Sequence, residues 1–138
     1  MARTEEAAAW FSAVYRAVQQ VPVGKVTTYG HIALLLDHPE RARQVGVCLK
    51  HLPSAPDPDD RYSQLFNGGN VPWQRIINSK GAISPRGPGG AQRQADVLTE
   101  EGVEVEYDGM EYRIKLGTFG WFPKALPSED EAGSGDHC

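Results

Sequence analysis

The chain has 138 residues, 40% of them hydrophobic, with 14 basic and 18 acidic side chains. This length supports one ordinary hydrophobic core, and the two cysteines, Cys48 and Cys138, fit neither a disulfide framework nor a zinc-ligand spacing. No opening apolar run resembles a signal peptide, and no apolar stretch reaches the ~18 residues that a membrane span needs. We therefore expect a soluble, intracellular, monomeric protein without metal or cofactor, in the nucleus if eukaryotic and otherwise in the cytoplasm.

Charge is distributed unevenly along the chain. Residues 41–56 contain three basic and no acidic side chains, and residues 61–95 contain five basic and none acidic. Acidic residues are dense in 96–111 and in the tail 128–138, and removal of the four tail acids leaves 14 basic against 14 acidic residues. The middle of the chain therefore predicts a basic surface that suits nucleic acid, although charge blocks also occur on ordinary solvated faces.

Three helices are predicted in the first part of the chain. The first begins at Thr4, carries apolar residues at helical spacing, and ends before the Pro and Gly of residues 22–24. Thr28 caps a second, short helix that ends before Pro39, and residues 41–52 form a third helix with one apolar side. Two short helices joined by a turn, the second basic, are typical of a DNA-binding helix-turn-helix, although a purely structural helix pair shows the same pattern.

The second part of the chain alternates loops with short elements. Residues 53–70 are rich in Pro, Asp, Gly and Asn, which predicts a long, mobile surface loop, and residues 85–90 predict another loop. A final helix is expected over 91–101, stopped by Gly102. Alternating apolar residues on both sides of the turn at 108–109 predict a β-hairpin that forms a wing beside the helix-turn-helix.

The predicted fold is mainly α with a small β-hairpin, a winged helix-turn-helix-like domain. We expect Trp121 and Phe122 to pack back on the core, so that one domain spans residues 1–127. Residues 128–138 are polar and acidic, and they are predicted to form a disordered tail.

The most informative motif is the block VPWQRIINSKG at 71–81. It resembles the active-site motif of the O6-alkylguanine-DNA alkyltransferases, in which Pro-Cys-His-Arg surrounds the cysteine that accepts the alkyl group. Trp73 stands where that cysteine would be, as in the alkyltransferase-like branch, whose members bind such lesions without removing the alkyl group. The resemblance extends from about residue 11 to about residue 123. Three further blocks stand in family order, two before this motif and one after it: PVGKVTTYG at 22–30, ARQVG at 42–46 and LTEEGV at 98–103.

Two consequences follow for fold and chemistry. The resemblance implies the fold of the alkyltransferase C-terminal domain. Alkyl transfer needs an activated thiolate, and an indole is no substitute for it, so the residues themselves argue against an enzyme. Cys48 lies on the apolar side of a predicted helix with no base near it in sequence, and Cys138 ends the chain. Gln74 replaces the histidine that usually follows the cysteine or tryptophan position, which weakens any remaining proton relay.

The resemblance also implies how DNA is bound. Arg43 is the finger that replaces a flipped nucleotide, and Tyr29 presses on the backbone phosphate; the plainer readings are a phosphate contact for Arg43 and a half-buried ring for Tyr29. Gln44 and Lys50, on the polar sides of the same predicted helix, are expected to contact DNA. The implied partner is double-stranded DNA containing O6-alkylguanine, with nucleotide excision repair as the recipient of the lesion.

The same resemblance assigns a lesion pocket. Trp73 lines it, Pro72 helps to shape its wall, and backbone groups near Val71 and Trp73 are expected to hydrogen-bond the base edge. Arg86 stacks on the alkylated base, where a cation over a π face contributes about 0.5–2 kcal/mol. Arg75 and Glu101 are expected to be structural supports, with hydrogen bonds that brace the motif.

Three alternative functions remain open at this stage. The first is an active alkyltransferase, and the absence of the cysteine from the motif argues against it. A helix-turn-helix regulator without lesion specificity reads base edges directly and has no need of the block around Pro72 and Trp73. A scaffold protein that uses the motif surface for protein contacts predicts no DNA binding.

Overall fold

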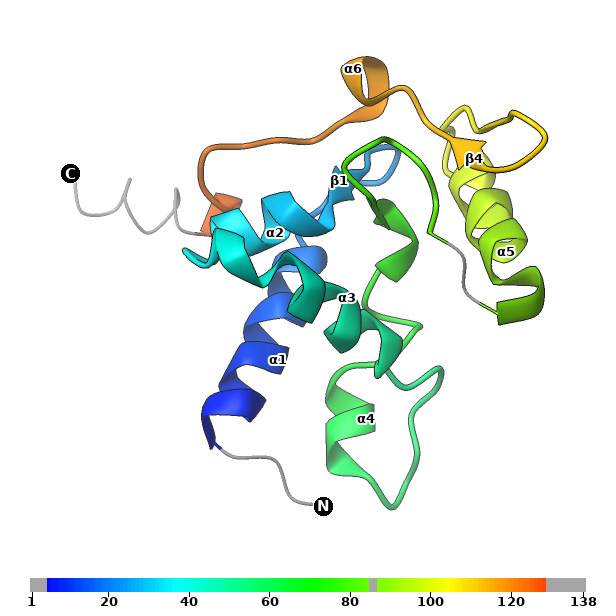
Figure 1. Ribbon diagram of the computed structural model, residues 1–138. Helices are drawn as coiled ribbons and strands as arrows, with labels where there is room; N and C mark the ends of the chain where they lie inside the picture. The colour runs from blue at the N-terminus through cyan, green and yellow to red at the C-terminus, as the bar shows by residue number, and fades with distance from the viewer. Residues whose placement is uncertain (1–4, 85–86, 129–138) are drawn as a thin grey trace.

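The computed structural model describes residues 5–84 and 87–128, drawn in colour in Figure 1. In chain order its elements are α1 (Glu5–Val18), β1 (Thr27–Thr28), α2 (Tyr29–Leu35), the 3-10 helix η1 (Pro39–Arg41), α3 (Ala42–Lys50), α4 (Arg61–Leu65), the 3-10 helix η2 (Trp73–Arg75), β2 (Ile76–Ile77), α5 (Gly87–Glu100), β3 (Glu106–Tyr107), β4 (Tyr112–Arg113) and α6 (Leu116–Phe119). Thr4, Arg86, Cys138 and nearly all of the predicted tail lie outside the described residues.

The first three helices form as predicted and pack on one another. Acidic residues in the first turn of α1 and Arg16 in its last turn complement the helix dipole, and its inward side is fully buried at Val14 and Tyr15. The Thr28 hydroxyl caps α2 by accepting a hydrogen bond from the His31 backbone N–H at 3.1 Å. A turn with Asp37 in a left-handed conformation (φ 65°) and Pro39 then leads through η1 into α3. These contacts build the predicted helix-turn-helix.

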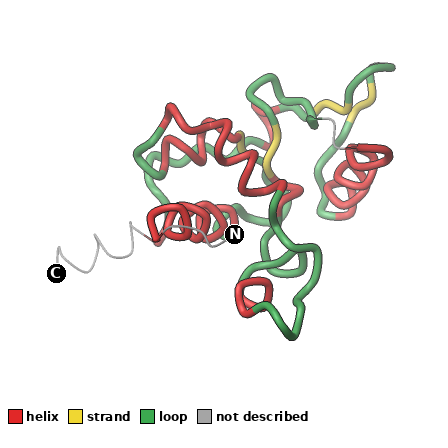
Figure 2. The backbone as a smooth tube through the Cα atoms, turned by 60° about the horizontal axis from the view of Figure 1, so that its bottom comes forward, coloured by secondary structure: helices red, strands yellow, loops and turns green. Residues whose placement is uncertain are grey.

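A short parallel strand pair divides the molecule into two hydrophobic cores. β1 pairs with β2, with Thr27 opposite Ile76 and Thr28 opposite Ile77. Since successive strand residues point to opposite faces, Ile76 joins the core among α1, α2 and α3, while Ile77 joins the second core under α5. Figures 1 and 2 show α5 on the far side of this strand pair from α1.

The β-hairpin is also present, but its main neighbour differs from the prediction. β3 and β4 pair antiparallel around the loop at 108–111, and β4 packs against α5. The Ile83 and Ile114 backbone N–H groups bond to the Tyr112 and Gly81 carbonyls, which tie the hairpin to the preceding turn. The wing therefore lies beside α5 and the second core, and not against the helix-turn-helix.

Three local predictions are corrected by the structure. The segment 53–70 contains α4, capped by the Asp60 carboxylate, which accepts from the Tyr62 N–H at 3.0 Å, and Phe66 is buried in the first core. Helix α5 begins at Gly87, so the expected loop at 85–90 is helical from that residue, which is possible because Pro is tolerated in a first helical turn. A short helix, α6, follows the hairpin where no helix was expected.

The C-terminal segment returns to the first core (Figure 1). The Val26 N–H and carbonyl bond to the Phe119 carbonyl and the Trp121 N–H, which fixes the returning chain beside β1. Trp121 packs against the first core as predicted. Phe122 does not enter the core: it stays 47% exposed, with its ring edge-on to His31 at 5.1 Å.

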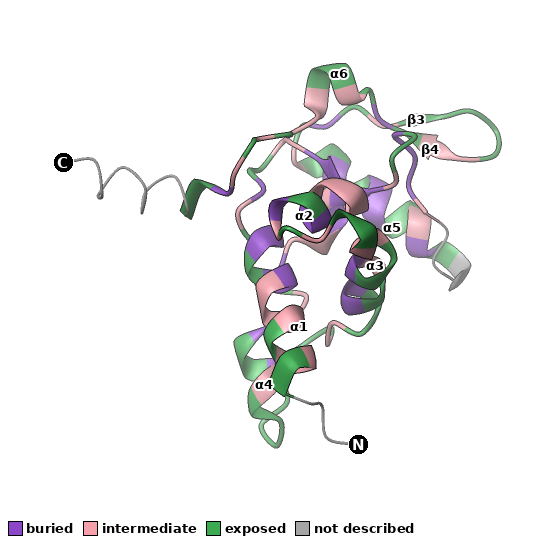
Figure 3. Ribbon diagram, turned by 60° about the vertical axis from the view of Figure 1, so that its left-hand side comes forward, coloured by how far each residue is buried: buried purple, intermediate pink, exposed green. Residues whose placement is uncertain are grey.

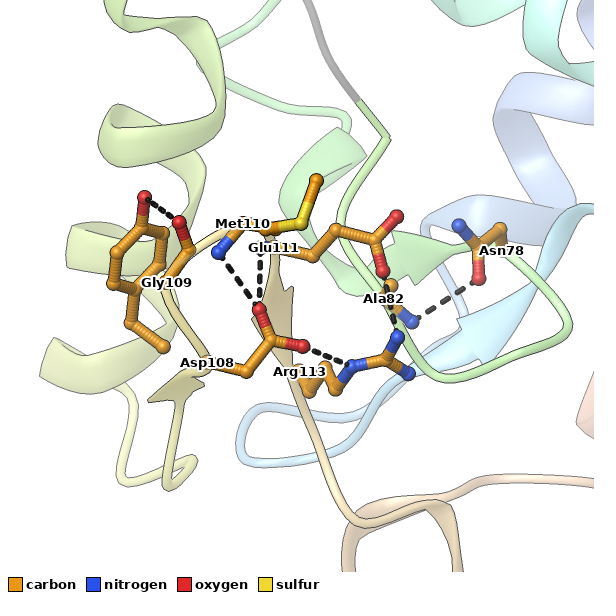
Figure 4. A network of polar contacts seen from close by, with 8 residues as sticks. Asn78, Ala82, Asp108, Gly109, Met110, Glu111 and Arg113 are labelled. Carbon is orange, nitrogen blue, oxygen red and sulfur yellow. Dashed lines mark hydrogen bonds and ion pairs between the residues drawn. The ribbon is translucent and has the colours of Figure 1, made fainter.

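The hairpin loop is organised by one carboxylate (Figure 4). Asp108 accepts hydrogen bonds from the Met110 and Glu111 N–H groups and from Arg113 Nε at 2.8 Å. The bond from Arg113, followed by the two backbone bonds, lowers the pKa of Asp108 from its ordinary value of 3.8 to about 2. A depressed carboxyl pKa stabilises the fold above the unfolded-state pKa, and this contribution is lost as the pH falls through about 2.

We expect a carboxyl NMR titration to place the midpoint of Asp108 near 2. Arg113→Ala is expected to raise that midpoint toward 3.8, because the leading cause of the shift is removed. Lys115→Ala is the control, since Lys115 lies 3.7 Å from Glu106 and does not contact Asp108. An unchanged midpoint in the Arg113 variant would contradict this account of the loop.

Candidate nucleic-acid interface

A hollow of about 520 Å³ opens between the two helices of the helix-turn-helix and the turn after β2. Its lining comes from the start of α2, the start of α3 and the turn: Tyr29, Gly30, Ala42, Arg43, Gly46, Asn78, Ser79 and Ser84. Tyr29 is half-buried and its ring lies against Gly46, where an added Cβ would stand 3.8 Å from the ring. The structure thus brings Tyr29 and Arg43, which are distant in sequence, to one site.

The outward side of α3 carries exposed polar and basic residues; Figure 3 shows that the helix has both exposed and buried parts. Arg43, Gln44 and Lys50 are exposed, and the helix contains no acidic residue. Its inward side is formed by Val45 and Cys48, both fully buried. The helix therefore presents two cations and an amide to solvent while its apolar side holds it in the first core, which is the arrangement that a helix in a DNA groove requires.

A second hollow, of about 280 Å³, lies at the other end of α3. It is lined by the end of α3, both ends of the 53–70 segment, Trp73 and the start of α5: Leu49, Leu52, Pro53, Ser54, Gly68, Trp73, Gly90 and Arg93. Ala42 and Gly46 line the first hollow and Leu49 the second, and this spacing places both hollows along one side of α3. We call the second hollow the Trp73 pocket.

The sequence-predicted pocket residues are not all in this pocket. Trp73 lines it and is partly buried against the first core. Val71 is completely buried, and Val71 and Pro72 line a separate polar hollow of about 300 Å³ together with Gln74 and Arg75. Arg86 lies outside the described residues. Arg93, which also lines the Trp73 pocket, was missed by sequence reasoning, because its approach to the pocket depends on how α5 packs.

An ion pair ties the motif around Trp73 to Glu101, the residue that directly follows α5. Arg75 bonds Glu101 through two nitrogens, Nε at 3.0 Å and Nη2 at 2.7 Å, and its Nη1 donates to the Val21 carbonyl at 2.8 Å. Only 12% of the Arg75 side chain and 14% of the Glu101 side chain are exposed. The hydrogen bonds from Arg75, opposed by burial and reinforced by Gln74, hold the pKa of Glu101 below its ordinary value.

Two glutamines extend this network. Gln74 Nε2 donates to Glu101 Oε2 at 2.9 Å, so its amide occupies a carboxylate oxygen that Arg75 also uses. Gln94, which is 1% exposed on α5, donates to the backbone carbonyls of Gln74 and Ile76 at 3.0 and 3.1 Å. The segment that follows Trp73 is therefore held in two ways. Glu101 binds its side chains, and Gln94 binds its backbone carbonyls.

Cys48 is the cysteine that the structure describes, and it is completely buried in α3. Its backbone carbonyl accepts a hydrogen bond from the Tyr15 hydroxyl at 2.5 Å. It lines neither hollow. Over residues 5–84 and 87–128, no group of three His, Cys, Asp or Glu is placed to hold a metal ion, and no helix there has the length and apolar character for a membrane span.

The fold and the two hollows define a helix-turn-helix protein with a pocket beside its recognition helix. The family model of the 6-O-methylguanine DNA methyltransferase DNA-binding domain matches residues 9–103. The chain belongs to this family, which confirms the resemblance seen in its motifs.

Two relatives indicate the branch of the family to which the chain is similar. The chain is 43% identical over 116 residues to alkyltransferase-like protein 1 of Schizosaccharomyces pombe, covering 83% of this chain and 95% of that protein. It is 40% identical over 108 residues to the DNA base-flipping protein of Escherichia coli, covering 78% of this chain and 70% of that protein. These similarities confirm the alkyltransferase-like identification.

Solved structures agree with this identification. The crystal structure of S. pombe Atl1 in complex with damaged DNA containing O6-carboxymethylguanine matches with a TM-score of 0.68 and 42% identity, covering 88% of this chain and all of that one. The O6-methylguanine methyltransferase of Mycobacterium tuberculosis matches with a TM-score of 0.53 and 27% identity, covering 72% of this chain and 50% of that one. The predicted alkyltransferase-type fold with its helix-turn-helix is thereby confirmed.

Proposed function

We propose that this protein binds double-stranded DNA at O6-alkylguanine, flips the damaged base into the Trp73 pocket, and leaves the alkyl group in place. The observation that carries the proposal is that Trp73 lies on the wall of a hollow beside α3. Its motif is the one in which the sequence resemblance expects the family's alkyl-acceptor cysteine. Two similar proteins support the same proposal by their names, alkyltransferase-like protein 1 and DNA base-flipping protein. The crystal structure of Atl1 with damaged DNA supports it as well.

Binding begins at the outward side of α3. Arg43 and Lys50 neutralise phosphate charge and release counterions, while Gln44 is placed to contact base edges or the backbone. The protein as a whole carries a formal charge of −4, so attraction to DNA depends on this local basic surface and not on net charge.

Base flipping uses the hollow shared by Tyr29 and Arg43. An alkyl group on O6 weakens pairing, so extrusion costs less at the lesion than at guanine. Arg43, exposed at the start of α3, fills the space that the base leaves, while the half-buried Tyr29 presses on the backbone phosphate. Lesion preference then arises in part before any pocket contact is made.

The Trp73 pocket receives the flipped base. Its volume, about 280 Å³, is near the lower end of small-molecule pockets, and its apolar lining from Leu49, Leu52 and Trp73 suits a base and an alkyl chain. Val71 and Pro72 fix the chain that presents Trp73, and Arg86 stacks on the base. Arg75 and Glu101 hold this chain against α5 through their ion pair.

The bound lesion stays alkylated because the pocket offers no thiolate. Transfer requires a sulfur nucleophile and a base that removes its proton. Trp73 supplies neither, and the Gln74 amide donates its hydrogen bond to Glu101 where a proton-accepting histidine would stand in the family motif. The protein is thus a sensor that hands the lesion on, and nucleotide excision repair is the recipient that the family implies. It acts as a soluble, intracellular monomer.

The first test compares binding to paired duplexes by fluorescence anisotropy, one with O6-methylguanine and one with guanine. We expect affinity for the lesion to be higher by about tenfold or more, which corresponds to ~1.4 kcal/mol. Mass analysis of the recovered DNA is expected to show the methyl group still on the base. Equal binding to both duplexes favours a helix-turn-helix regulator without lesion specificity, and loss of methyl would contradict the proposed lack of transfer.

A further inference from the structure

The Trp73 pocket contains a cation that the proposed function has not used. Arg93 lies on α5, on the lining of a pocket otherwise formed by apolar side chains, glycines and Ser54. Its Nη1 lies 3.5 Å from the position that a Cβ on Gly89 would take, so the guanidinium folds back over the first turn of its own helix. Helical side chains lean toward the N-terminus in this way, which here brings the charge to the pocket rim.

The guanidinium of Arg93 has no carboxylate partner among the residues that the structure describes. Arg75, by contrast, is paired with Glu101, and Arg113 is paired with two carboxylates. The nearest acid along α5, Asp96, accepts a hydrogen bond from Gln92 Nε2 at 2.8 Å. Arg93 is therefore available to a ligand without first breaking an ion pair within this part of the chain.

The opposite wall of the pocket is fixed by the base of the 53–70 segment. The Gly68 N–H donates to the Pro53 carbonyl at 2.7 Å, which closes the two ends of the segment on each other. A Cβ on Gly68 would stand 3.0 Å from the Ser54 carbonyl oxygen, so this wall has little room to shift. A group held between this wall and α5 therefore meets a defined space with a positive charge at one edge.

We infer that Arg93 is a specificity-determining residue that makes the pocket favour O6-alkylguanines whose alkyl group ends in a carboxylate. A guanidinium donates two parallel hydrogen bonds to a carboxylate, which gives the pair a fixed geometry even though Arg93 is exposed at the pocket rim. A neutral alkyl group leaves Arg93 solvated and gains nothing from it. The inference rests on the proposed function, because it requires the lesion to enter this pocket.

The test uses three duplexes that differ at one base: guanine, O6-carboxymethylguanine and O6-carbamoylmethylguanine. The two alkyl groups have the same shape, and they differ in that the carboxylate is charged and the amide is not. We expect the protein to bind the carboxylate duplex about three- to tenfold more tightly than the amide duplex, a range set by a charge-assisted bond at a partly exposed site.

Arg93→Gln is expected to remove this difference while keeping a preference for both alkylated duplexes over guanine. Arg93→Lys is expected to retain part of it, since lysine keeps the charge but not the two-pronged geometry. Arg61→Gln is the matched control: it removes one positive charge from α4, where Arg61 lines a different hollow with Tyr62, Gln64 and Leu65. The control should lower all three affinities alike and leave the ratio unchanged.

The outcomes separate this inference from the proposed function. Equal affinity for the two alkylated duplexes, with both bound more tightly than guanine, overturns the role of Arg93 and leaves lesion recognition standing. A carboxylate preference that survives in Arg93→Gln also overturns it. No preference for either alkylated duplex over guanine overturns the proposed function itself. Circular dichroism and thermal unfolding of each variant establish that the folded state is retained.

Discussion

Glu101→Ala is expected to destabilise the folded protein by about 3 kcal/mol, because it leaves the Arg75 charge buried without its carboxylate. The Arg75 side chain is 12% exposed, and two of its nitrogens donate hydrogen bonds to Glu101. The variant also removes the acceptor of the Gln74 amide. Urea unfolding measures the free energy directly, and thermal unfolding should show a midpoint lower by about 10 °C.

Glu100→Ala is the matched control, since Glu100 is exposed at the neighbouring position of α5. Its effect should stay within about 0.5 kcal/mol, as for most surface substitutions. A Glu101 variant as stable as this control would show that the Arg75 pair contributes nothing net to the fold, and the bracing role given to it would be wrong.

The same pair predicts a dependence on pH with a definite sign. The pKa of Glu101 lies below its ordinary value of 4.5, chiefly through the hydrogen bonds from Arg75. A group with a lowered folded-state pKa contributes stability above its unfolded-state pKa and loses it as the pH falls through the folded-state value. The stability gap between the protein and Glu101→Ala is therefore expected to be full near pH 7 and to shrink below about pH 4.5.

The elements that sequence predicts well are those held by local signals. The helical spacing in α1 and the Thr28 cap of α2 are properties of neighbouring residues, and both recur in the structure. The tight turn before Pro39 is equally local. These signals place the helix-turn-helix, and the family motifs predict which of its residues face DNA.

The elements that sequence misses depend on distant parts of the chain. β1 pairs with β2 across nearly 50 residues, and two-residue strands leave no alternating pattern to read. Helix α4 is only five residues long, within a Pro- and Asp-rich segment whose composition indicates a loop. It is held by tertiary contacts, since Phe66 just after it packs into the first core near Tyr15. Such contacts override local composition.

The candidate site also combines features that the sequence predicts with features that depend on contacts between distant parts of the chain. Tyr29 and Arg43 were predicted from motifs, and packing of α2 on α3 brings them to one hollow. The block around Trp73 was expected to line one pocket, but the 3-10 turn sends Trp73 to one side and Val71 and Pro72 to another. The entry of Arg93 into the pocket depends on how α5 docks, which no spacing in the sequence reveals.

Arg43→Ala is expected to weaken binding to the O6-methylguanine duplex by about 30-fold, equivalent to ~2 kcal/mol, a magnitude typical of an arginine at an interface hot spot. Arg43 is exposed at the start of α3 and lines the hollow with Tyr29, so its loss leaves the space of an extruded base unfilled. The effect should be smaller on the guanine duplex, in which the base stays stacked more of the time.

Lys50→Ala is the comparison that separates flipping from charge. Lys50 lies two turns further along α3. If it contacts a phosphate, its loss should weaken binding to both duplexes by a similar factor and reduce the slope of log K against log salt concentration by about one. A 2-aminopurine placed beside the lesion reports unstacking: the Lys50 variant at saturating protein should retain the fluorescence increase, and the Arg43 variant should lose most of it. If Arg43→Ala weakens both duplexes equally and keeps the signal, Arg43 is a phosphate contact, and extrusion of the base is driven from elsewhere in the interface.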